Sequence, residues 1–585
     1  MTDCPPRPTS ERPQDLGFTR QPMTRWMAPG QLIATGLQVV LSGIFGEYAD
    51  KRESQESRPC EPVDLSAGDD IWVDFVSDLG DGFNPTYAVA CLLAEEKLDL
   101  AGAGGQSVPT ERGRLLVMSG DEVYPAAHID RYRNKMTGPY RAALPHTEPE
   151  HPLLVALPGN HDWYDGLTAF SRVFCQGNWI GGWQTTQRRS YFAVALPHRW
   201  WLWGIDIQFD TYIDEPQLEF FRDKAGALLQ PGDSVLLCSA KPNWVDAYLG
   251  KPDAYGTLDF FQRTTIEPRQ AVVRALLTGD SHHYARYQAR AGGAELITAG
   301  GGGAFLSDTH HLPPAIELPP PLARAGKRAK AAGTYDLKTT YPTQKQSRRI
   351  AAGVFTLAAK NPSFAALVGA IYALYAWTVV AALRAPSQKL ADVALPDTLG
   401  QAAAGILRSP VAMVLSVVLV LGLAGFSKAE SRGRKAAVGS AHAAFQIGAV
   451  IAVLAGAGAL LGGGSGLPLV VLFVALSGVV GGLAGSLVMA AYLYLVDRFL
   501  QLNANELFAA QRIEDWKNFL RLHIDHEGVL TIYPVKIDKV PKKWRLRRGG
   551  EQDDPWFEPD GPATAPVLLE EPIRITPASA TPPPG

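Results

Sequence analysis

Side chains of the kinds that bind metal ions follow four apolar runs between residues 70 and 310. Each run leads at once into a short segment that contains glycine together with Asp, Asn, His or Tyr. These candidate ligands and proton donors are Asp78; Asp121 and Tyr124; Asn160, His161 and Asp162; and Asp280 and His282. A single Asp after a strand is usually a turn or helix-cap residue, but four such ends in one chain are hard to explain by capping. Oxygen ligands mixed with imidazole and a tyrosinate predict a site for iron, manganese or zinc.

The apolar runs that precede these side chains are predicted to be β-strands. They cover residues 71–76, 115–118, 153–157 and 272–277. Helical stretches alternate with them, which predicts a layered α/β domain. Ligand sites in such sheets lie at the carboxyl ends of the strands, so we expect the four segments to meet there.

The order of these motifs resembles the calcineurin-like metallophosphoesterase superfamily. The motifs that carry the resemblance are Asp78…Gly120-Asp121-x-x-Tyr124…Gly159-Asn160-His161-Asp162…Gly279-x-x-His282. Gly80 after Asp78, and Tyr124 after Asp121, are most similar to the purple acid phosphatase branch. The resemblance covers under half of the chain. It implies a metallophosphoesterase-type β-sandwich of two mixed sheets flanked by helices, with two metal ions at the strand ends.

The resemblance also implies roles for the candidate residues. A first metal site would consist of Asp78, Asp121, Tyr124 and His282. Asp121 would bridge to the second ion, which Asn160 would also bind. His161 would contact the phosphate or protonate the leaving oxygen, and Asp162 would orient His161. The two divalent or trivalent ions (iron, manganese or zinc) would supply a hydroxide that attacks a phosphoester substrate.

Two positions depart from the family pattern. The family places a His two residues before a Pro after a central strand, whereas Ala240 precedes Pro242 here. The last family motif is usually Gly-His-x-His, and Asp280 replaces its first His. Asp280 can still bind a hard cation, so the second site would favour manganese or magnesium. His283 and His310 are candidates for a substitute ligand, although the favoured interpretation of each is an ordinary exposed histidine.

Four apolar segments in the second half predict an all-α transmembrane bundle. They lie near 364–383, 405–426, 441–461 and 467–496, and each approaches or exceeds the ~20 residues that cross a bilayer. A buried soluble bundle would need polar outer faces, which these segments hardly offer. Frequent glycines, such as Gly482, would let the helices approach closely.

The charges of the loops predict the orientation in the membrane. Lys and Arg precede the first segment, lie between the second and third, and follow the fourth, whereas residues 462–466 carry no charge. The positive-inside rule therefore places both termini and the catalytic domain in the cytoplasm. Five scattered cysteines fit a reducing compartment, and the first residues do not resemble a signal peptide. Membrane lipid is the expected neighbour, and a net charge of −3 gives no reason to expect nucleic acid.

Composition divides the chain into seven predicted regions. They are a disordered N-terminus (1–28), an amphipathic helix and linker (29–69), the metallophosphoesterase domain (70–320), a basic linker (321–363), a transmembrane region of about four helices (364–496), a C-terminal cytoplasmic segment (497–549) and a disordered tail (550–585). The helix after residue 29 packs on the globular domain in the favoured interpretation, or lies at the membrane surface in the other. Residues 513–520 predict an amphipathic helix, and 529–537 a strand that could dock on the catalytic domain.

Two function classes fit these features. The first is a membrane-anchored phosphoesterase, and the alternative is a catalytically weakened membrane sensor that binds metal or phosphate. The absent imidazoles at Ala240 and Asp280 favour the sensor. His161 and Asp162 favour the enzyme, because a sensor would not need a general acid.

Overall fold

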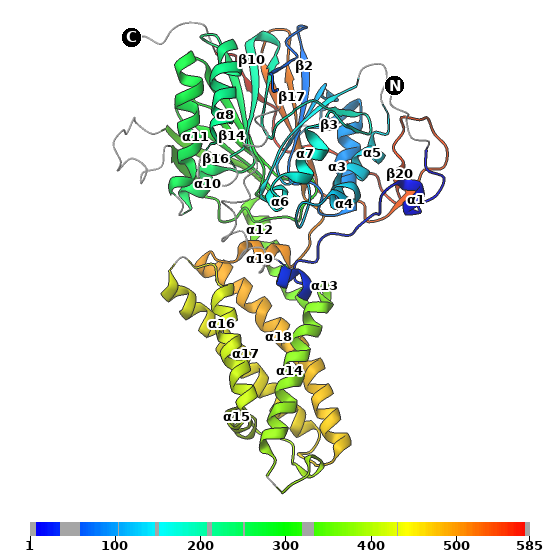
Figure 1. The fold of residues 1–585 in the computed structure, drawn as a ribbon, viewed down its shortest axis with the longest axis vertical. Helices are drawn as coiled ribbons and strands as arrows, with labels where there is room; N and C mark the ends of the chain where they lie inside the picture. Colours follow the sequence, from blue (N-terminus) through cyan, green and yellow to red (C-terminus); the bar gives the residue numbers. More distant parts are fainter. Residues whose placement is uncertain are drawn as a thin grey trace. The chain divides into compact units, whose positions relative to one another are not determined.

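The computed structural model describes residues 7–34, 59–102, 105–146, 151–207, 213–249, 252–318, 333–385, 387–429 and 431–578. The chain forms two compact units, shown in Figure 1. The first comprises the described parts of Met1–Thr24, Gln38–Ser347 and Ile513–Gly585, and the second those of Arg25–Leu37 and Arg348–Arg512. The helical unit is therefore an insertion in the sequence of the α/β unit. The amphipathic helix predicted after residue 29 lies largely outside the described residues. Of the predicted helix, the described part is residues 29–34, which are helical.

The first unit contains two large mixed sheets. The first sheet has the order β4 (Ser107–Glu111), β3 (Lys97–Ala101), β21 (Val567–Leu568), β18 (Leu530–Ile537), β17 (Lys517–Ile524), β2 (Ile71–Val76), β5 (Leu115–Ser119), β6 (Leu153–Leu157), β8 (Trp183–Thr185) and β7 (Trp179–Ile180), with β22 (Ile573–Ile575) paired to β18. The second has the order β1 (Val63–Asp64), β9 (Phe192–Leu196), β10 (Trp200–Ile205), β11 (Ser234–Ser239), β12 (Val272–Thr278), β14 (Glu295–Ala299), β13 (Tyr284–Ala289), β16 (Gly333–Tyr341) and β15 (Ala315–Leu318). A separate pair joins β19 (Trp544–Leu546) to β20 (Phe557–Pro559).

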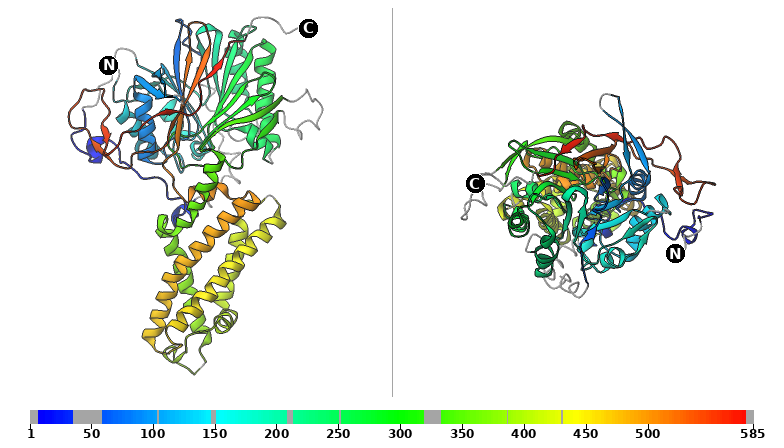
Figure 2. Two further views of the ribbon diagram at one scale, coloured as in Figure 1. Left: turned by 180° about the vertical axis from the view of Figure 1, so that it is seen from behind. Right: turned by 90° about the horizontal axis from the view of Figure 1, so that it is seen from above.

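The two sheets pack face to face between two layers of helices (Figure 2). Alternate strand residues build the inner core, since successive side chains of a strand point to opposite faces. Val73 and Phe75 of β2 share one buried cluster with Leu202 of β10 and Leu277 of β12. Helices α3 (Phe83–Ala94), α5 (Gly138–Ala143) and α7 (Thr168–Phe174) cover the outer face of the first sheet, and α8 (Glu215–Glu219), α10 (Asn243–Tyr248) and α11 (Gly256–Phe261) cover that of the second. The predicted fold class, an α/β sandwich flanked by helices together with an all-α region, is confirmed.

The segment after the apolar helices differs from the prediction. In place of the amphipathic helix expected at 513–520, residues 513–516 form no regular element and 517–520 begin β17, which lies between β18 and β2 in the first sheet. Leu520 packs between the sheets and Phe519 packs beneath the helices. A central strand buried on both faces shows no clean alternation, so its apolar spacing also fits a helix.

Both ends that were predicted to be disordered contribute ordered structure. Phe557, Leu568 and Ile575 of the expected tail are buried, and β20, β21 and β22 lie within it. Near the N-terminus, Leu16 and Phe18 belong to the cluster on the outer face of the first sheet. The proline-rich composition suggested disorder, but these few large apolar side chains bury enough surface to hold the segments in place.

A buried cation joins β17 to the rest of the first sheet. The Arg521 Nε lies 3.2 Å from Asp74 Oδ1 on β2. The same guanidinium donates to the backbone carbonyls of Leu92 (3.1 Å), Glu95 (2.9 Å) and Thr110 (3.3 Å). Since Arg521 and Asp74 are both buried, the pair exists only while β17 occupies its place.

The second unit contains three helices long and apolar enough to cross a membrane, or four if a bent pair counts as one span, among the described residues. The three are α14 (Pro362–Leu383), α17 (Arg432–Leu460) and α18 (Leu467–Leu500). The predicted span 405–426 is broken, because α15 (Leu399–Arg408) and α16 (Pro410–Phe426) meet at 93°. Proline has no N–H to continue a helix, and the Ser409 side chain accepts from Ala412 N to begin α16.

Small residues bring α14 and α18 close together, as predicted. A Cβ on Gly369 would lie 2.6 Å from the carbonyl oxygen of Gly478 and 3.5 Å from the Cα of Gly482. A larger side chain at this point would therefore force the two helices apart.

Candidate metal centre

Strand ends from both sheets carry the predicted ligands to one place. Strands β2, β5 and β6 run parallel, so their carboxyl ends share one edge, and Asp78, Asp121 and Asn160 follow them. His282 follows β12 of the second sheet. Asp78, Asp121 and His282 are buried, and one ligand atom from each lies within 4.8 Å of the others. The structure thus brings together three of the predicted metal ligands.

Tyr124 lies in the middle of these three side chains. Its hydroxyl oxygen is 3.0 Å from Asp78 Oδ1, 3.2 Å from Asp121 Oδ2 and 2.8 Å from His282 Nε2. A hydroxyl has one hydrogen, so it can donate to only one of the two carboxylates. Four buried groups that all offer lone pairs to one point fit a bound cation.

Asn160 also faces Asp121. Its side-chain oxygen lies 3.3 Å from Asp121 Oδ1 and 2.9 Å from Oδ2, so three acceptor atoms face one another. Turning the amide over would replace this contact with hydrogen bonds. Either orientation places the Asn160 side chain beside Asp121, and its role as a metal ligand stays a prediction.

The backbone at the centre is strained. Asp78, Asp121, Asp280 and His282 have positive φ values of 59°, 54°, 64° and 47°. Residues other than glycine rarely adopt this backbone conformation. It persists where the surrounding structure enforces it, commonly at functional sites. A neighbouring glycine shows how close the packing is, because a Cβ on Gly279 would overlap the Ser77 side chain.

Burial and crowding of carboxyl groups disfavour negative charge in this centre. Burial, followed by repulsion from Asp121 and Asp280, raises the pKa of Asp78 well above its ordinary value. Burial and then Asp162 raise the pKa of Asp121 to about 8, and burial and then Asp121 raise the pKa of Asp280 to about 7. Burial, above all, holds the pKa of His282 well below its ordinary value. Without a cation, the centre therefore holds protons on its carboxyl groups at neutral pH.

Metal affinity is expected to rise between pH 6 and pH 8. A protonated carboxyl must lose its proton before it binds metal, and the pKa values of about 7 for Asp280 and about 8 for Asp121 place this competition in that range. The dependence should level off about one pH unit above the pKa of Asp121, where this carboxyl is almost fully deprotonated. Calorimetric titration of the metal-free protein with Mn²⁺, in buffers of different ionisation enthalpy, would measure affinity and proton release together. A pH-independent affinity without proton release would contradict this account.

His161 begins the second part of the centre, on α6 (Asn160–Trp163). Its Nδ1 lies 2.7 Å from the carbonyl oxygen of Pro125, and its backbone N–H donates to Asp121 Oδ1 at 2.8 Å. A carbonyl only accepts, so Nδ1 carries the hydrogen and Nε2 is the nitrogen that gains or loses a proton. Burial lowers the pKa of this imidazole, so the neutral ring is favoured near pH 7 and a proton taken up on Nε2 is readily released.

Asp162 makes hydrogen bonds in the turn that carries His161, and its predicted role in orienting the imidazole stays a prediction. Its carboxylate accepts from the backbone of Gly159 (2.9 Å) and of Glu122 (3.2 Å), and from the Tyr132 hydroxyl. Asp162 therefore shapes the turn that carries His161, while the Pro125 carbonyl holds the ring. A backbone acceptor leaves no mark in the residue types, so the sequence could not reveal it.

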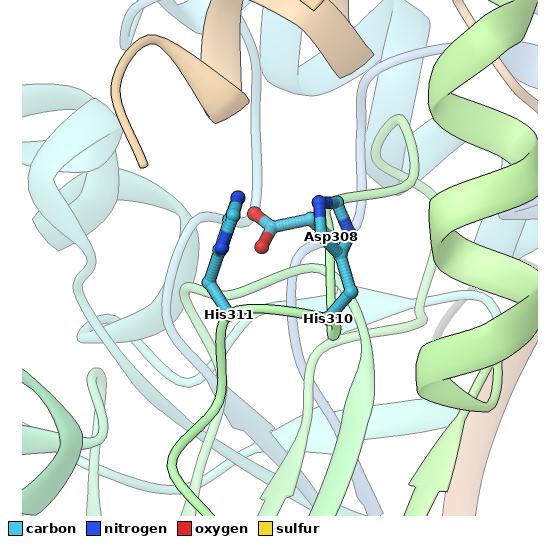
Figure 3. A group of neighbouring side chains, drawn as sticks. All are labelled: Asp308, His310 and His311. Carbon is cyan, nitrogen blue, oxygen red and sulfur yellow. The ribbon is translucent and has the colours of Figure 1, made fainter. Parts of the chain in front are cut away.

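The positions that depart from the family pattern also lie here. Ala240 is buried next to Gly120, where a Cβ would lie 2.8 Å from the alanine methyl. Asp280 experiences the charge of Lys241 as well as that of Asp121. His283 and His310 were expected to be exposed, but both are buried. His310 belongs to a separate group with Asp308 and His311, residues that the sequence analysis did not single out (Figure 3).

No protein-family model matches this sequence, and no curated protein matches it. Solved structures that are similar to part of the chain include the following two. One, described as "GAP50 the anchor in the inner membrane complex of Plasmodium", is 12% identical with a TM-score of 0.28, covering 41% of this chain and 74% of that one. The other, "Structure of PhoD", is 12% identical with a TM-score of 0.27, covering 43% of this chain and 60% of that one. Similarity at this level concerns the fold alone, so the chemistry of the centre must be argued from its own residues.

Proposed function

We propose that this protein is a membrane-anchored, metal-dependent phosphoesterase of the calcineurin-like type. The observation that carries the proposal is the convergence of Asp78, Asp121, Tyr124 and His282, with His161 beside them. These four would hold the first ion, and Asp121, Asn160 and Asp280 the second. The ions, when bound, would supply a hydroxide at neutral pH and neutralise charge on a phosphoryl group.

The protein's own groups would position and protonate the substrate. When its ring is protonated on both nitrogens, His161 would give the Nε2 proton to the leaving oxygen and return to the neutral form, whose Nδ1–H the Pro125 carbonyl accepts. The imidazole also packs against Tyr124, with ring centroids 4.5 Å apart, and against the half-exposed Tyr164 at 5.4 Å. Tyr164 is therefore placed to border the substrate. Lipid head groups, nucleotides and phosphoproteins are the classes of phosphoester that a substrate panel should cover.

His161→Ala tests the enzyme directly. We expect the variant to keep its metal content and to lose roughly 10²–10⁴ in kcat, the usual contribution of a positioned general acid. Substrates with poor leaving groups should lose most and an activated aryl phosphate least, because the latter needs little protonation. The measurement is a panel of phosphomonoesters and phosphodiesters with the full chain in detergent, loaded with manganese, iron or zinc. His526→Ala, at an exposed histidine, is the matched control.

The buried methyl of Ala240 supports a second candidate, the catalytically weakened sensor, since it leaves the second ion one imidazole short. Turnover of no phosphoester by the wild-type protein under any metal loading would favour this sensor. Measured turnover that His161→Ala leaves unchanged for every leaving group would keep the enzyme but reject His161 as its acid.

We further propose that both termini and the metal centre face the cytoplasm, with lipid around the apolar helices. In a background without the five native cysteines, Ser465→Cys should react with an impermeant thiol reagent added outside, and Lys345→Cys should react only after lysis. Both side chains are exposed, so burial does not bias the comparison. The physical reason is the excess of Lys and Arg before the first apolar segment, between the second and third, and after the fourth. The reverse labelling pattern would reject this orientation.

A further inference from the structure

A second group of ligand-type side chains lies on the segment that follows the glycine-rich turn after β14. Asp308, His310 and His311 each offer one ligand atom, and the three atoms lie within 4.8 Å of one another. Figure 3 shows the Asp308 carboxylate between the two imidazoles. None of these residues belongs to the Asp78 cluster, so this is a separate place at which a metal ion could bind.

The backbone that carries the group is fixed by hydrogen bonds. Thr309, between Asp308 and His310, donates its N–H to Ser347 Oγ at 3.0 Å and its hydroxyl to the Pro342 carbonyl at 2.8 Å. Thr309 is fully buried, and this anchoring holds the residues on either side of it in place. The fold therefore fixes the backbone positions of the three ligand-type residues.

Ser347 also contacts one of the imidazoles. Its hydroxyl oxygen lies 2.8 Å from His310 Nδ1. With the hydrogen on Nδ1, the ring donates to Ser347, and Nε2 keeps the lone pair that a metal needs. An outer hydrogen bond of this kind is typical of metal-binding histidines, because it fixes both the tautomer and the ring orientation.

The ligand types indicate which metal would bind. Two imidazoles and one carboxylate suit a transition metal such as zinc, whereas magnesium and calcium prefer oxygen ligands throughout. The ligand atoms of the group lie within 4.8 Å of one another, and those around tetrahedral zinc are about 3.4 Å apart. Small rotations of the two imidazoles, which are tilted by 47° to each other, would bring their nitrogens to this spacing. Asp308 and His311 are half-buried, which leaves access for an ion and a water.

The segment also supports the turn that carries His282. The Gly300 N–H donates to the carbonyl of His283 at 2.9 Å, and the Ser307 N–H reaches the carbonyl of His282 at 3.5 Å. The His283 ring is hydrogen-bonded to the backbone of Asp308 itself. An ion held at Asp308 would therefore stiffen the backbone behind the proposed phosphoesterase centre without sharing a ligand with it.

We propose that Asp308, His310 and His311 bind one divalent transition-metal ion of the zinc type, separate from the ions of the Asp78 cluster. The test uses the full chain in detergent after chelation, titrated with Zn²⁺ and, as a spectroscopic probe, Co²⁺. Asp121→Asn serves as the starting variant, because it weakens the first centre and leaves the second group intact. We expect it to bind one Zn²⁺ per chain and to show the visible absorption of Co²⁺ with nitrogen ligands.

Adding His311→Ala to this starting variant should weaken Zn²⁺ binding more than 100-fold and remove the Co²⁺ absorption. His311→Gln, which keeps a polar side chain of similar size, should do the same while circular dichroism stays unchanged. His526→Ala should have no effect. If the His311 variants bind Zn²⁺ and Co²⁺ like the starting variant, the group is only a histidine–carboxylate contact and the proposal is rejected. Because the readout is ion binding, an absence of phosphoesterase activity would not change this result.

Discussion

Asp121→Asn is expected to remove metal from the Asp78 cluster and to abolish phosphoesterase activity while the protein stays folded. The asparagine keeps the shape of the side chain but loses the charge that, in the proposed arrangement, bridges both ions. Residues that only orient metal ligands typically cost 10–100-fold when changed, so a shared ligand should cost more than about 100-fold. Metal content per chain and turnover of a phosphoester, measured on the same sample, would check this.

The metal-free variant gives a second and independent readout. Burial raises the pKa of Asp121 to about 8, so the folded metal-free protein must protonate this carboxyl at neutral pH. When the pKa of a carboxyl is higher in the folded state than in the unfolded state, the protein loses stability as the pH rises from the unfolded value towards the folded value. Asp121→Asn removes that cost, so at pH 8 the metal-free variant should melt no lower than metal-free wild type.

Asp223→Asn is the control, because it makes the same chemical change at an exposed residue of the same unit. It should leave metal content, turnover and the melting temperature unchanged. Full metal content and full activity in Asp121→Asn would mean that the strand-end aspartate is only a turn residue.

Local sequence patterns were sufficient to predict that these side chains gather, because they follow directly on the strands that position them. Asp78 and Asp121 follow the carboxyl ends of the neighbouring parallel strands β2 and β5, so strand prediction alone brings them together. The hydrogen bond from His161 to Pro125 is different, because a backbone carbonyl carries no information in its residue type. The partner of Asp162 was equally hidden, since Tyr132 lies 30 residues away on another helix.

The errors in the fold have physical causes as well. β17 is buried on both faces, and a short apolar run of this kind cannot be told from a buried helix by spacing. The break between α15 and α16 did leave a signal, because Ser409 and Pro410 are a typical helix start in the middle of an apolar run. The prediction of a single span at 405–426 used only length and hydropathy, which do not detect such a break.

A chain that ends at Arg512 is expected not to form the α/β unit. It would lack β17, β18 and β21, which lie between β2 and β3 in the first sheet, and also β22. Loss of β17 would expose the backbone edge of β2 and the inner-core face that Leu520 covers, and exposed edges of this kind promote aggregation. The truncated chain should be degraded or aggregate in detergent, as measured by size-exclusion chromatography and limited proteolysis. A chain that ends at residue 578 keeps every described strand and should behave like the full protein.

A milder change tests the same dependence at one side chain. Arg521→Met leaves β17 in place but removes the partner of the buried Asp74 carboxyl, which should cost about 3–5 kcal/mol. Burial already raises the pKa of Asp74 to about 6 against the opposing effect of Arg521, and losing the arginine would raise it further. The loss of stability should therefore be small near pH 5, where Asp74 can stay protonated, and should grow towards pH 8. Adding Asp74→Asn should recover part of the melting temperature at pH 8 and little at pH 5. Equal losses at both pH values, with no recovery, would mean that packing of the arginine stem rather than its charge joins β17 to the sheet.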